Sequence, residues 1–579
     1  MNQPTPAIVA QSAVRRLPRW SLLLLCLAYV VPGYVGRSPW RMADMEAFGY
    51  MRELALGHTS WLAPRMAGLL PESEGLLSYW LGALAMQGAP SWLHPEMAAR
   101  LPFIAMLVIT LAATWWGVYY LARTPGARPV AFAFGGEAQP TDYARAMADG
   151  GLLALVACLG LAQLSHETTS YMTQLGCAAL LFFAAAAMPY HGCTATLALL
   201  LGLPGLALSG APTVATLFGL GGTAMAFFSR TWGDEATPAP RASRLWTVLW
   251  LAVTILAAAL SWWLDQWAWR VVDSGTAKEW QSLVRLLLWF SWPAWPLALW
   301  TLWVWRRQIA TPRRYPHLAL PLWFAIIPVI ASLSTLPADR ALLLGLPAIA
   351  TLAAFALPTL RRSISALIDW FTLLFFSAAA IAIWVIWLSL QTGIPAKPAA
   401  NVARLAPQFT PEFSVLSFAV AVAATLAWCV LVAWRTSRNR AAIWKSLVLP
   451  ASGATLAWLL LMTLWLPLMD HARSFEPQMR LVLAELPRDG SCVQTYGLPR
   501  AHIAALRYYG DIDTQRLSMA GAARCDWMVA EEETWLDPHS ARLQATWETV
   551  ARVVRPTDRK DFLLVLKRRP EARPVQVKP

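Results

Sequence analysis

Two carboxylates stand where a hydrophobic segment gives way to a polar loop. Asp44 and Glu46 follow the first apolar segment, residues 20–36, by only a few positions. A carboxylate so close to the end of a membrane span is half-desolvated, and within hydrogen-bond reach of a hydroxyl it can act as a general base. The loop that carries both, residues 37–100, is long for a connector, and long loops in compact proteins are usually functional or disordered. We therefore expect acid–base chemistry in this loop.

A structural role for the same two carboxylates is the alternative. Acidic side chains in the first turn of a helix interact favourably with the positive end of its dipole and can cap its free N–H groups. Asp44 and Glu46 would then start the helix that follows them, without taking part in any reaction.

The composition indicates a helical protein that crosses a membrane many times. Of 579 residues, 57% are hydrophobic and only 14% are charged, which excludes an ordinary soluble protein. Apolar runs of about 17–25 residues are typical of membrane-spanning helices. The sequence predicts thirteen: 20–36, 101–121, 150–164, 173–188, 194–210, 212–228, 245–264, 283–305, 318–334, 341–358, 364–389, 412–434 and 446–467.

The positive charges indicate an orientation, and no nucleic-acid partner. The net charge is +14, but its arginines gather in alternate loops, as in the pairs Arg15–Arg16, Arg306–Arg307 and Arg361–Arg362. This is the positive-inside pattern of membrane proteins. With thirteen spans, it predicts a cytoplasmic N-terminus and an outer location for residues 37–100 and 468–579. The first apolar segment is expected to be a retained span rather than a signal peptide, because no small-residue cleavage site follows it.

The chain is therefore expected to have two domains. Residues 1–467 form the membrane domain, and residues 468–579 form a small outer α/β domain. Short apolar runs at CVQTYGL, CDWMVAEE, WETVARVV and FLLVLKRR predict strands, and helices are expected over 499–510 and near 472–486. Asp470, directly after the last span, is expected to be an interfacial cap. An oxidising compartment would permit a disulfide between Cys492 and Cys525, although spacing alone leaves this open.

The 41–80 stretch resembles the first extracytoplasmic loop of the GT-C glycosyltransferases that use polyprenyl-phosphate sugars. The similar group comprises the lipid A aminoarabinose transferases and protein O-mannosyltransferases. In this resemblance Asp44 takes the place of the catalytic carboxylate. The other matching residues are Gly57, Trp61, Pro64, Ser78, Tyr79, Trp80 and Arg100. The resemblance implies a GT-C fold, with Tyr79, Trp80 and Arg100 among the candidate substrate contacts.

Several positions depart from the family pattern. Met45 replaces a glutamate, Ala47 an arginine, and Glu74 a lysine that would help to hold a lipid phosphate. Glu46 could supply the missing carboxylate, although it would point about 100° further round a helix. The second acidic residue of the family falls at Gln174 or Leu175, so the direct match fails there.

Other residues could complete such a site. Glu167, next to His166 in a short outer loop, could accept a proton, and an ordinary solvated turn is the alternative. Arg340 could hold phosphate oxygens bidentately, with interfacial anchoring and pairing to Asp339 as its alternative role. Arg270 is a further phosphate candidate. Arg507 and Tyr508 are candidate acceptor contacts, which helix packing explains equally well.

The sequence therefore predicts an inner-membrane glycosyltransferase of bacteria with its site facing the periplasm. The donor would be a polyprenyl-phosphate sugar carrying a hexose or pentose. The acceptor would be lipid A, another glycan or a protein, and membrane lipids would surround the chain. A divalent metal ion is possible, without any ligand spacing to support one. Two alternatives are a GT-C scaffold with altered catalysis and a transporter or flippase of lipid-linked glycans.

Overall fold

The structure, a computed structural model, describes residues 5–72, 75–228, 240–267, 277–311, 315–335, 338–437, 442–487, 492–517 and 525–569. Its contacts divide the chain into two compact units. Unit 1 consists of Met1–Tyr34, Phe103–Ile383 and Leu416–Thr463, and unit 2 of Val35–Pro102, Trp384–Val415 and Leu464–Pro579. The first polar loop therefore belongs to the same unit as the C-terminal segment. The predicted division at residue 467 stays a prediction.

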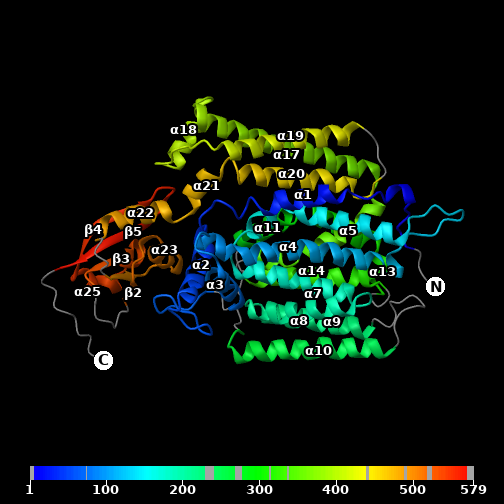
Figure 1. The fold of residues 1–579 in the computed structure, drawn as a ribbon, viewed down its shortest axis with the longest axis horizontal. Helices are drawn as coiled ribbons and strands as arrows, with labels where there is room; N and C mark the ends of the chain where they lie inside the picture. The colour runs from blue at the N-terminus through cyan, green and yellow to red at the C-terminus, as the bar shows by residue number, and fades with distance from the viewer. Residues whose placement is uncertain are drawn as a thin grey trace. The chain divides into compact units, whose positions relative to one another are not determined.

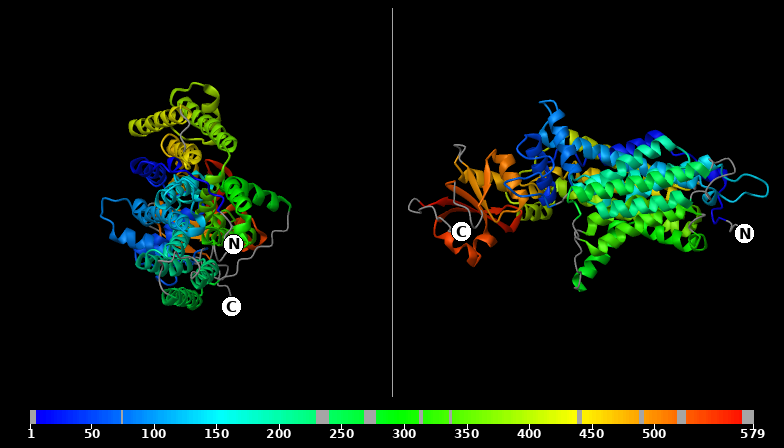
Figure 2. Two further views of the ribbon diagram at one scale, coloured as in Figure 1. Left: turned by 90° about the vertical axis from the view of Figure 1, so that its right-hand side faces the viewer. Right: turned by 90° about the horizontal axis from the view of Figure 1, so that it is seen from below.

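Unit 1 is a bundle of helices that run side by side (Figure 1). Its helices are α1 (Arg19–Val30), α4 (Pro95–Ala122), α5 (Pro140–Ala157), α6 (Leu159–Leu164), α7 (Ser170–Ala187), α8 (Gly192–Leu208), α9 (Pro212–Phe228), α10 (Pro240–Trp263), α11 (Ala277–Phe290), α12 (Ala294–Val304), α13 (Arg306–Ile309), α14 (Pro316–Ser334), α15 (Ala338–Leu343), α16 (Leu346–Ala356), α17 (Arg362–Thr392), α19 (Val415–Ser437) and α20 (Lys445–Leu461). The start of α4, up to Pro102, and the end of α17, from Trp384, belong to unit 2. The end-on view in Figure 2 shows the same helices packed around one another. Neighbouring pairs include α7 with α8, α9 with α10 and α12 with α16.

The helices confirm a multi-pass membrane protein but differ in length from the thirteen predicted spans. Among the residues described, six helices are long and apolar enough to cross a membrane: α4, α7, α10, α14, α17 and α19. A seventh span results when α20 and the following helix count as one broken span. Five further apolar helices have 10–17 residues. The predicted span 150–164 is instead divided between α5 and α6, and 283–305 between α11 and α12.

Unit 2 contains the first polar loop, a connector and the C-terminal segment. Its helices are α2 (Arg41–Ala55), α3 (Leu77–Gly88), α18 (Ala396–Leu405), α21 (Leu466–Arg473), α22 (Glu476–Glu485), α23 (Arg500–Gly510), α24 (Glu532–Trp535) and α25 (Ala541–Gln544). Helix α2 packs closely against α23 because Gly49 has no side chain: a Cβ there would lie 2.5 Å from the Cβ of Ala504. A helix of the first loop and a helix of the C-terminal segment thus form one structure.

A five-stranded mixed sheet completes unit 2. Its strands are β1 (Val493–Tyr496), β2 (Thr514–Arg516), β3 (Trp527–Glu531), β4 (Trp547–Arg555) and β5 (Asp558–Arg568), in the order β2-β1-β3-β5-β4. β1 is parallel to β2 and β3, whereas β5 is antiparallel to β3 and β4. The core includes Met528, Trp535, Trp547 and Leu566. The predicted small α/β domain is confirmed as a fold. The prediction did not include the short strand β2 or the short helices α24 and α25.

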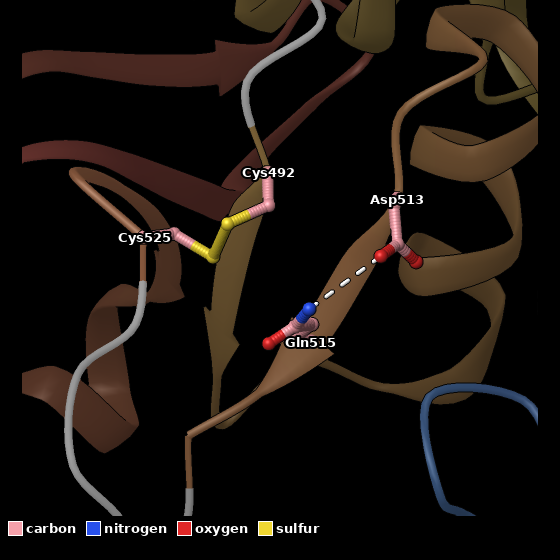
Figure 3. Close-up of a disulfide and its surroundings, with 4 residues drawn as sticks. All are labelled: Cys492, Asp513, Gln515 and Cys525. Atoms are coloured by element: carbon pink, nitrogen blue, oxygen red, sulfur yellow. Dashed lines mark hydrogen bonds between the residues drawn. A yellow bond between two sulfur atoms is a disulfide. The ribbon is translucent and has the colours of Figure 1, made fainter.

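A disulfide joins the starts of two neighbouring strands. Cys492 precedes β1 and Cys525 precedes β3, their Cα atoms lie 5.4 Å apart, and their sulfur atoms are bonded (Figure 3). The pairing considered from the sequence is therefore present in the structure. It fixes the two parallel strands at the end where the chain enters them.

Candidate active site

The Asp44 carboxylate lies in the first turn of α2 and is 1% exposed. Its Oδ2 atom accepts a hydrogen bond from the backbone N–H of Trp40 at 3.0 Å, which is the capping role considered above. The same oxygen accepts a hydrogen bond from the Arg37 guanidinium at 2.9 Å. The side chains of Arg37 and Asp44 are 2% and 1% exposed. Asp44 is therefore both a helix cap and one half of a buried ion pair.

Further charges surround this pair within unit 2. Arg100, which the sequence match placed at the start of the second span, is 3% exposed. It experiences the charges of Arg37, Asp44, Glu96 and Asp470. Buried charges of this density are found only where they balance each other, so the loop has an organised electrostatic centre.

Glu46 is occupied by the loop that follows α2. Its Oε1 atom accepts the Glu72 N–H at 2.9 Å, and the Arg500 side chain lies 4.0 Å from the same oxygen. Burial raises the pKa of the Glu46 carboxyl, against the opposing effects of the Glu72 N–H and Arg500. These contacts anchor the loop, so a structural role alone explains the position of Glu46. Its predicted part in catalysis stays a prediction.

The aromatic pair of the resemblance also supports the loop. Tyr79 is buried, with its ring centroid 5.6 Å from that of Tyr50. The Trp80 indole donates a hydrogen bond to the carbonyl of Trp61 at 2.7 Å. The residues matched to the family motif, Trp61 and Trp80, thus contact each other directly.

Arg507 and Tyr508 of α23 lie against α2. The Arg507 Nε atom is 3.0 Å from Glu53, a carboxylate whose side chain is 4% exposed. The Tyr508 ring meets Phe48 edge-to-face at 4.8 Å. Burial raises the pKa of the Tyr508 phenol, and the nearby Glu96 carboxylate raises it further. Helix packing therefore accounts for both residues, and their predicted contact with an acceptor stays a prediction.

In unit 1, the loop between α6 and α7 differs from the expected solvated turn. Six consecutive polar residues, from Ser165 to Ser170, are all buried, with exposures of 0–6%. His166 packs its ring against Tyr34 and Trp458, with ring centroids 4.8 Å apart in each case. A Cβ at Gly33 would overlap the His166 ring at 2.2 Å, so this packing requires glycine. A polar loop buried in a membrane bundle carries a high cost and is commonly functional.

Glu167 of this loop pairs with Arg340 of α15. The Arg340 Nη2 atom is 3.4 Å from the Glu167 Oε2 atom, and the side chains are 19% and 8% exposed. The guanidinium also lies 4.9 Å from the Tyr171 ring centroid. Asp339, the partner considered from the sequence, instead accepts the backbone N–H of Arg340. The two sequence-predicted residues Glu167 and Arg340 are therefore brought together.

Three further residues considered from the sequence are Arg270, Glu74 and Gln174. Arg270 and Glu74 lie outside the described residues. Gln174, where the family has an acid, donates a hydrogen bond to the Ser209 carbonyl at 2.7 Å.

Within the described ranges, no group of three or more His, Cys, Asp or Glu side chains is arranged to hold a metal ion. The possible metal ion stays a prediction.

Sequence reasoning missed Arg37 and Asp470. Arg37 lies seven residues before Asp44, just after the first span, and its charge at that boundary was a usable signal. Asp470, expected to be an interfacial cap, accepts hydrogen bonds from Ser38 and Trp40 with its carboxylate. Contacts across 430 and 432 positions leave no local pattern in the sequence.

Comparisons with known proteins identify the fold. No family model matches the chain, and no curated protein matches its sequence. Two solved structures of ArnT from Cupriavidus metallidurans are similar over 95% of this chain and 98% of theirs. The apo structure has 16% identity and a TM-score of 0.58. The structure bound to undecaprenyl phosphate has 17% identity and a TM-score of 0.59. The chain therefore has the fold of ArnT, which confirms the predicted fold class.

Proposed function

We propose that the protein is an integral membrane glycosyltransferase that moves a sugar from a polyprenyl-phosphate donor to a hydroxyl group of an envelope acceptor. The reaction would take place on the periplasmic face of the bacterial inner membrane, with lipid A, another glycan or a protein as acceptor. One observation carries the proposal: in a chain with the ArnT fold, the carboxylate expected to be catalytic, Asp44, is buried and oriented by two donors. ArnT is a lipid A aminoarabinose transferase, and one of its structures holds undecaprenyl phosphate.

The proposed chemistry is an inverting transfer. The acceptor oxygen bonds to the anomeric carbon of the sugar as the bond from that carbon to the phosphate oxygen breaks. Asp44 orients the acceptor hydroxyl and takes its proton, a contribution of about 10²–10⁴-fold for general-base catalysis. Arg37 and the Trp40 N–H support this role because they hold the carboxylate in one orientation.

Arg340 is proposed to stabilise the charge that develops on the leaving polyprenyl phosphate. Arginine suits this role because its planar guanidinium can engage two phosphate oxygens. Its contact with Glu167 is long and partly exposed, which favours exchange for another anion. Arg270, Arg100, Tyr79, Trp80, Arg507 and Tyr508 are kept as proposed substrate contacts.

An exposed apolar face of α11 in unit 1 supports a lipid donor. Trp280, Val284, Leu288 and Trp289 lie along this face and are all exposed. Helix α11 packs against α15, which carries Arg340. A prenyl chain could bury these aromatic and aliphatic side chains against its own apolar surface.

The test is mass spectrometry of lipid A and the other envelope glycans in the native host. It compares the wild type, a deletion, and the deletion complemented with wild-type protein, Asp44→Asn, or Arg37→Gln/Asp44→Asn. The double variant removes both charges of the buried pair, so that loss of function cannot be attributed to an unpaired Arg37. Asp511→Asn is the matched control, since this exposed carboxylate pairs with Arg52 at the other end of α2.

The expected result is that one sugar disappears in the deletion and returns only with wild-type protein and Asp511→Asn. Restoration by Asp44→Asn would mean that Asp44 serves only as the cap seen in its bond to the Trp40 N–H. That outcome would favour the scaffold with altered catalysis. An unchanged glycan profile in the deletion would contradict the proposed transfer in this host.

A further inference from the structure

Asp470 of α21 holds the short segment that precedes α2. Its Oδ1 atom accepts the Ser38 N–H at 2.9 Å and the Trp40 indole N–H at 2.6 Å. Its Oδ2 atom accepts the Ser38 hydroxyl at 3.2 Å. Three donors from residues 38 and 40 thus converge on one carboxylate from a distant part of the chain, and all of these residues belong to unit 2.

The same segment supplies two hydrogen-bond donors to Asp44. The Trp40 backbone N–H bonds to Asp44, and so does the Arg37 guanidinium, which also donates to the Ser38 carbonyl at 3.3 Å. Asp470 therefore contacts the residues that contact Asp44. Any movement of residues 37–40 would displace the cap and the ion pair together.

Further contacts hold Trp40 in place. Arg473 lies 5.3 Å from the centroid of the Trp40 ring, and Arg37 lies 4.9 Å from it. Trp40 also forms an isolated antiparallel bridge with Ser474. Helix α21 and Ser474 thus hold the backbone and the side chain of Trp40, the residue directly before α2.

We propose that Asp470 is a positioning residue, which sets the orientation of the Asp44 carboxylate by holding the Ser38–Trp40 segment. Asp470 acts through Ser38 and Trp40, which its oxygens contact. The part of this inference that concerns catalysis rests on the proposed function. The part that concerns position can be measured without any substrate.

The position is tested by hydrogen–deuterium exchange of the full-length protein in lipid nanodiscs. The Ser38 and Trp40 amides report directly, since they donate to Asp470 and Asp44 respectively. Loss of a hydrogen bond to a carboxylate should accelerate exchange about tenfold or more. Asp470→Ala should therefore accelerate the Ser38 amide directly and the Trp40 amide indirectly. Asp511→Asn should change neither. Unchanged exchange at Trp40 in a folded Asp470→Ala protein would overturn the proposal.

The catalytic consequence is tested by kinetics with a polyprenyl-phosphate donor that carries the sugar identified by the glycan experiment. Asp470→Asn should lower kcat at least tenfold with little change in the KM of the donor, because orientation rather than donor binding is lost. Asp44→Asn/Asp470→Asn should be no slower than Asp44→Asn alone, because Asp470 acts through Asp44.

Three results separate this inference from the proposed function. Additive losses in the double variant would overturn an action through Asp44. A full kcat in Asp470→Asn, despite faster exchange of the Trp40 amide, would also overturn an action of Asp470 on catalysis through Asp44. If Asp44→Asn is itself fully active, the proposed function fails, and the exchange of Ser38 and Trp40 still decides whether Asp470 positions the start of α2.

Discussion

The Arg37–Asp44 pair of unit 2 and the Arg340–Glu167 pair of unit 1 join the same chemical groups in different ways. The first contact measures 2.9 Å between side chains that are 2% and 1% exposed. The second measures 3.4 Å between side chains that are 19% and 8% exposed. Asp44 also accepts a backbone N–H, whereas the Arg340 guanidinium lies over the Tyr171 ring.

This difference indicates different tasks. A closely bonded, buried pair keeps its carboxylate in one place, as a group that must meet a reacting hydroxyl requires. A longer and partly exposed pair can release its guanidinium to an incoming phosphate at lower cost. The comparison therefore supports orientation as the role of the unit 2 pair and anion exchange as the role of the unit 1 pair.

The largest expected effect comes from Arg37→Ala. It leaves the Asp44 carboxylate buried without its guanidinium, which should cost about 3–5 kcal/mol of stability. The midpoint of thermal unfolding in detergent measures the loss, and Arg37→Gln/Asp44→Asn should recover most of it. The control is Arg480→Ala, whose pair with Glu476 is exposed; it should change stability by no more than about 0.5 kcal/mol. Equal effects of Arg37→Ala and Arg480→Ala would contradict the distinction.

Loss of the disulfide should have the next largest effect, restricted to unit 2. Cys492 and Cys525 are 33 positions apart, so the chain-entropy relation gives about 3–4 kcal/mol for the bond. In the double serine variant, hydrogen exchange should accelerate in β1 and β3, while α7 and α8 of unit 1 stay unchanged. Equal acceleration in both units would show that the sheet is not stabilised independently.

Arg340→Ala should cost less stability than Arg37→Ala, about 1–2 kcal/mol, yet lower transfer by at least about tenfold. The reason is that the Arg340 contact is longer and partly exposed, while its proposed task is to hold the leaving phosphate. Asp339→Asn is the matched control, because asparagine can still accept the Arg340 backbone N–H. Full transfer activity in Arg340→Ala would remove this residue from the proposed site.

The smallest effect should come from Glu46→Gln and should depend on pH. Burial raises the pKa of Glu46, so the folded protein binds this proton more tightly than the unfolded chain does. Its stabilising contribution is present below the ordinary glutamate pKa and is lost as the pH rises through the folded value. Glu46→Gln should therefore raise the unfolding midpoint slightly at pH 8 and leave it unchanged near pH 4. A lower midpoint at pH 8 would mean that the Arg500 attraction outweighs burial.

The fold was largely predictable because its signals are local. Continuous apolar runs predict helices, and four strands of the sheet have apolar runs long enough to be recognised. β2, from Thr514 to Arg516, has three residues and carries no such pattern. The short helix α18 was hidden by the prolines around it, although a proline just before or within the first turn is compatible with a helix.

Several residues of the candidate site were predictable, but the way in which they pair was not. The resemblance indicated Asp44, and the charge at a span end indicated Arg340, but neither identified Arg37 or the Glu167 contact. For His166 and Glu167, an ordinary solvated turn was the alternative to a role as proton acceptor, and the polar run Ser165–Ser170 that contains them is buried. It is buried because α1 and Trp458 cover it, which depends on tertiary packing alone.

The most direct test of the central claim is the release of polyprenyl phosphate from a lipid-linked sugar donor by the purified protein in nanodiscs. Wild-type protein is compared with Arg37→Gln/Asp44→Asn at matched unfolding midpoints, so that folding does not enter. We predict that the double variant is slower by about 10²–10⁴-fold, the contribution of a general base. A rate within a few-fold of the wild type would contradict the assignment of Asp44 and leave it as the cap of α2.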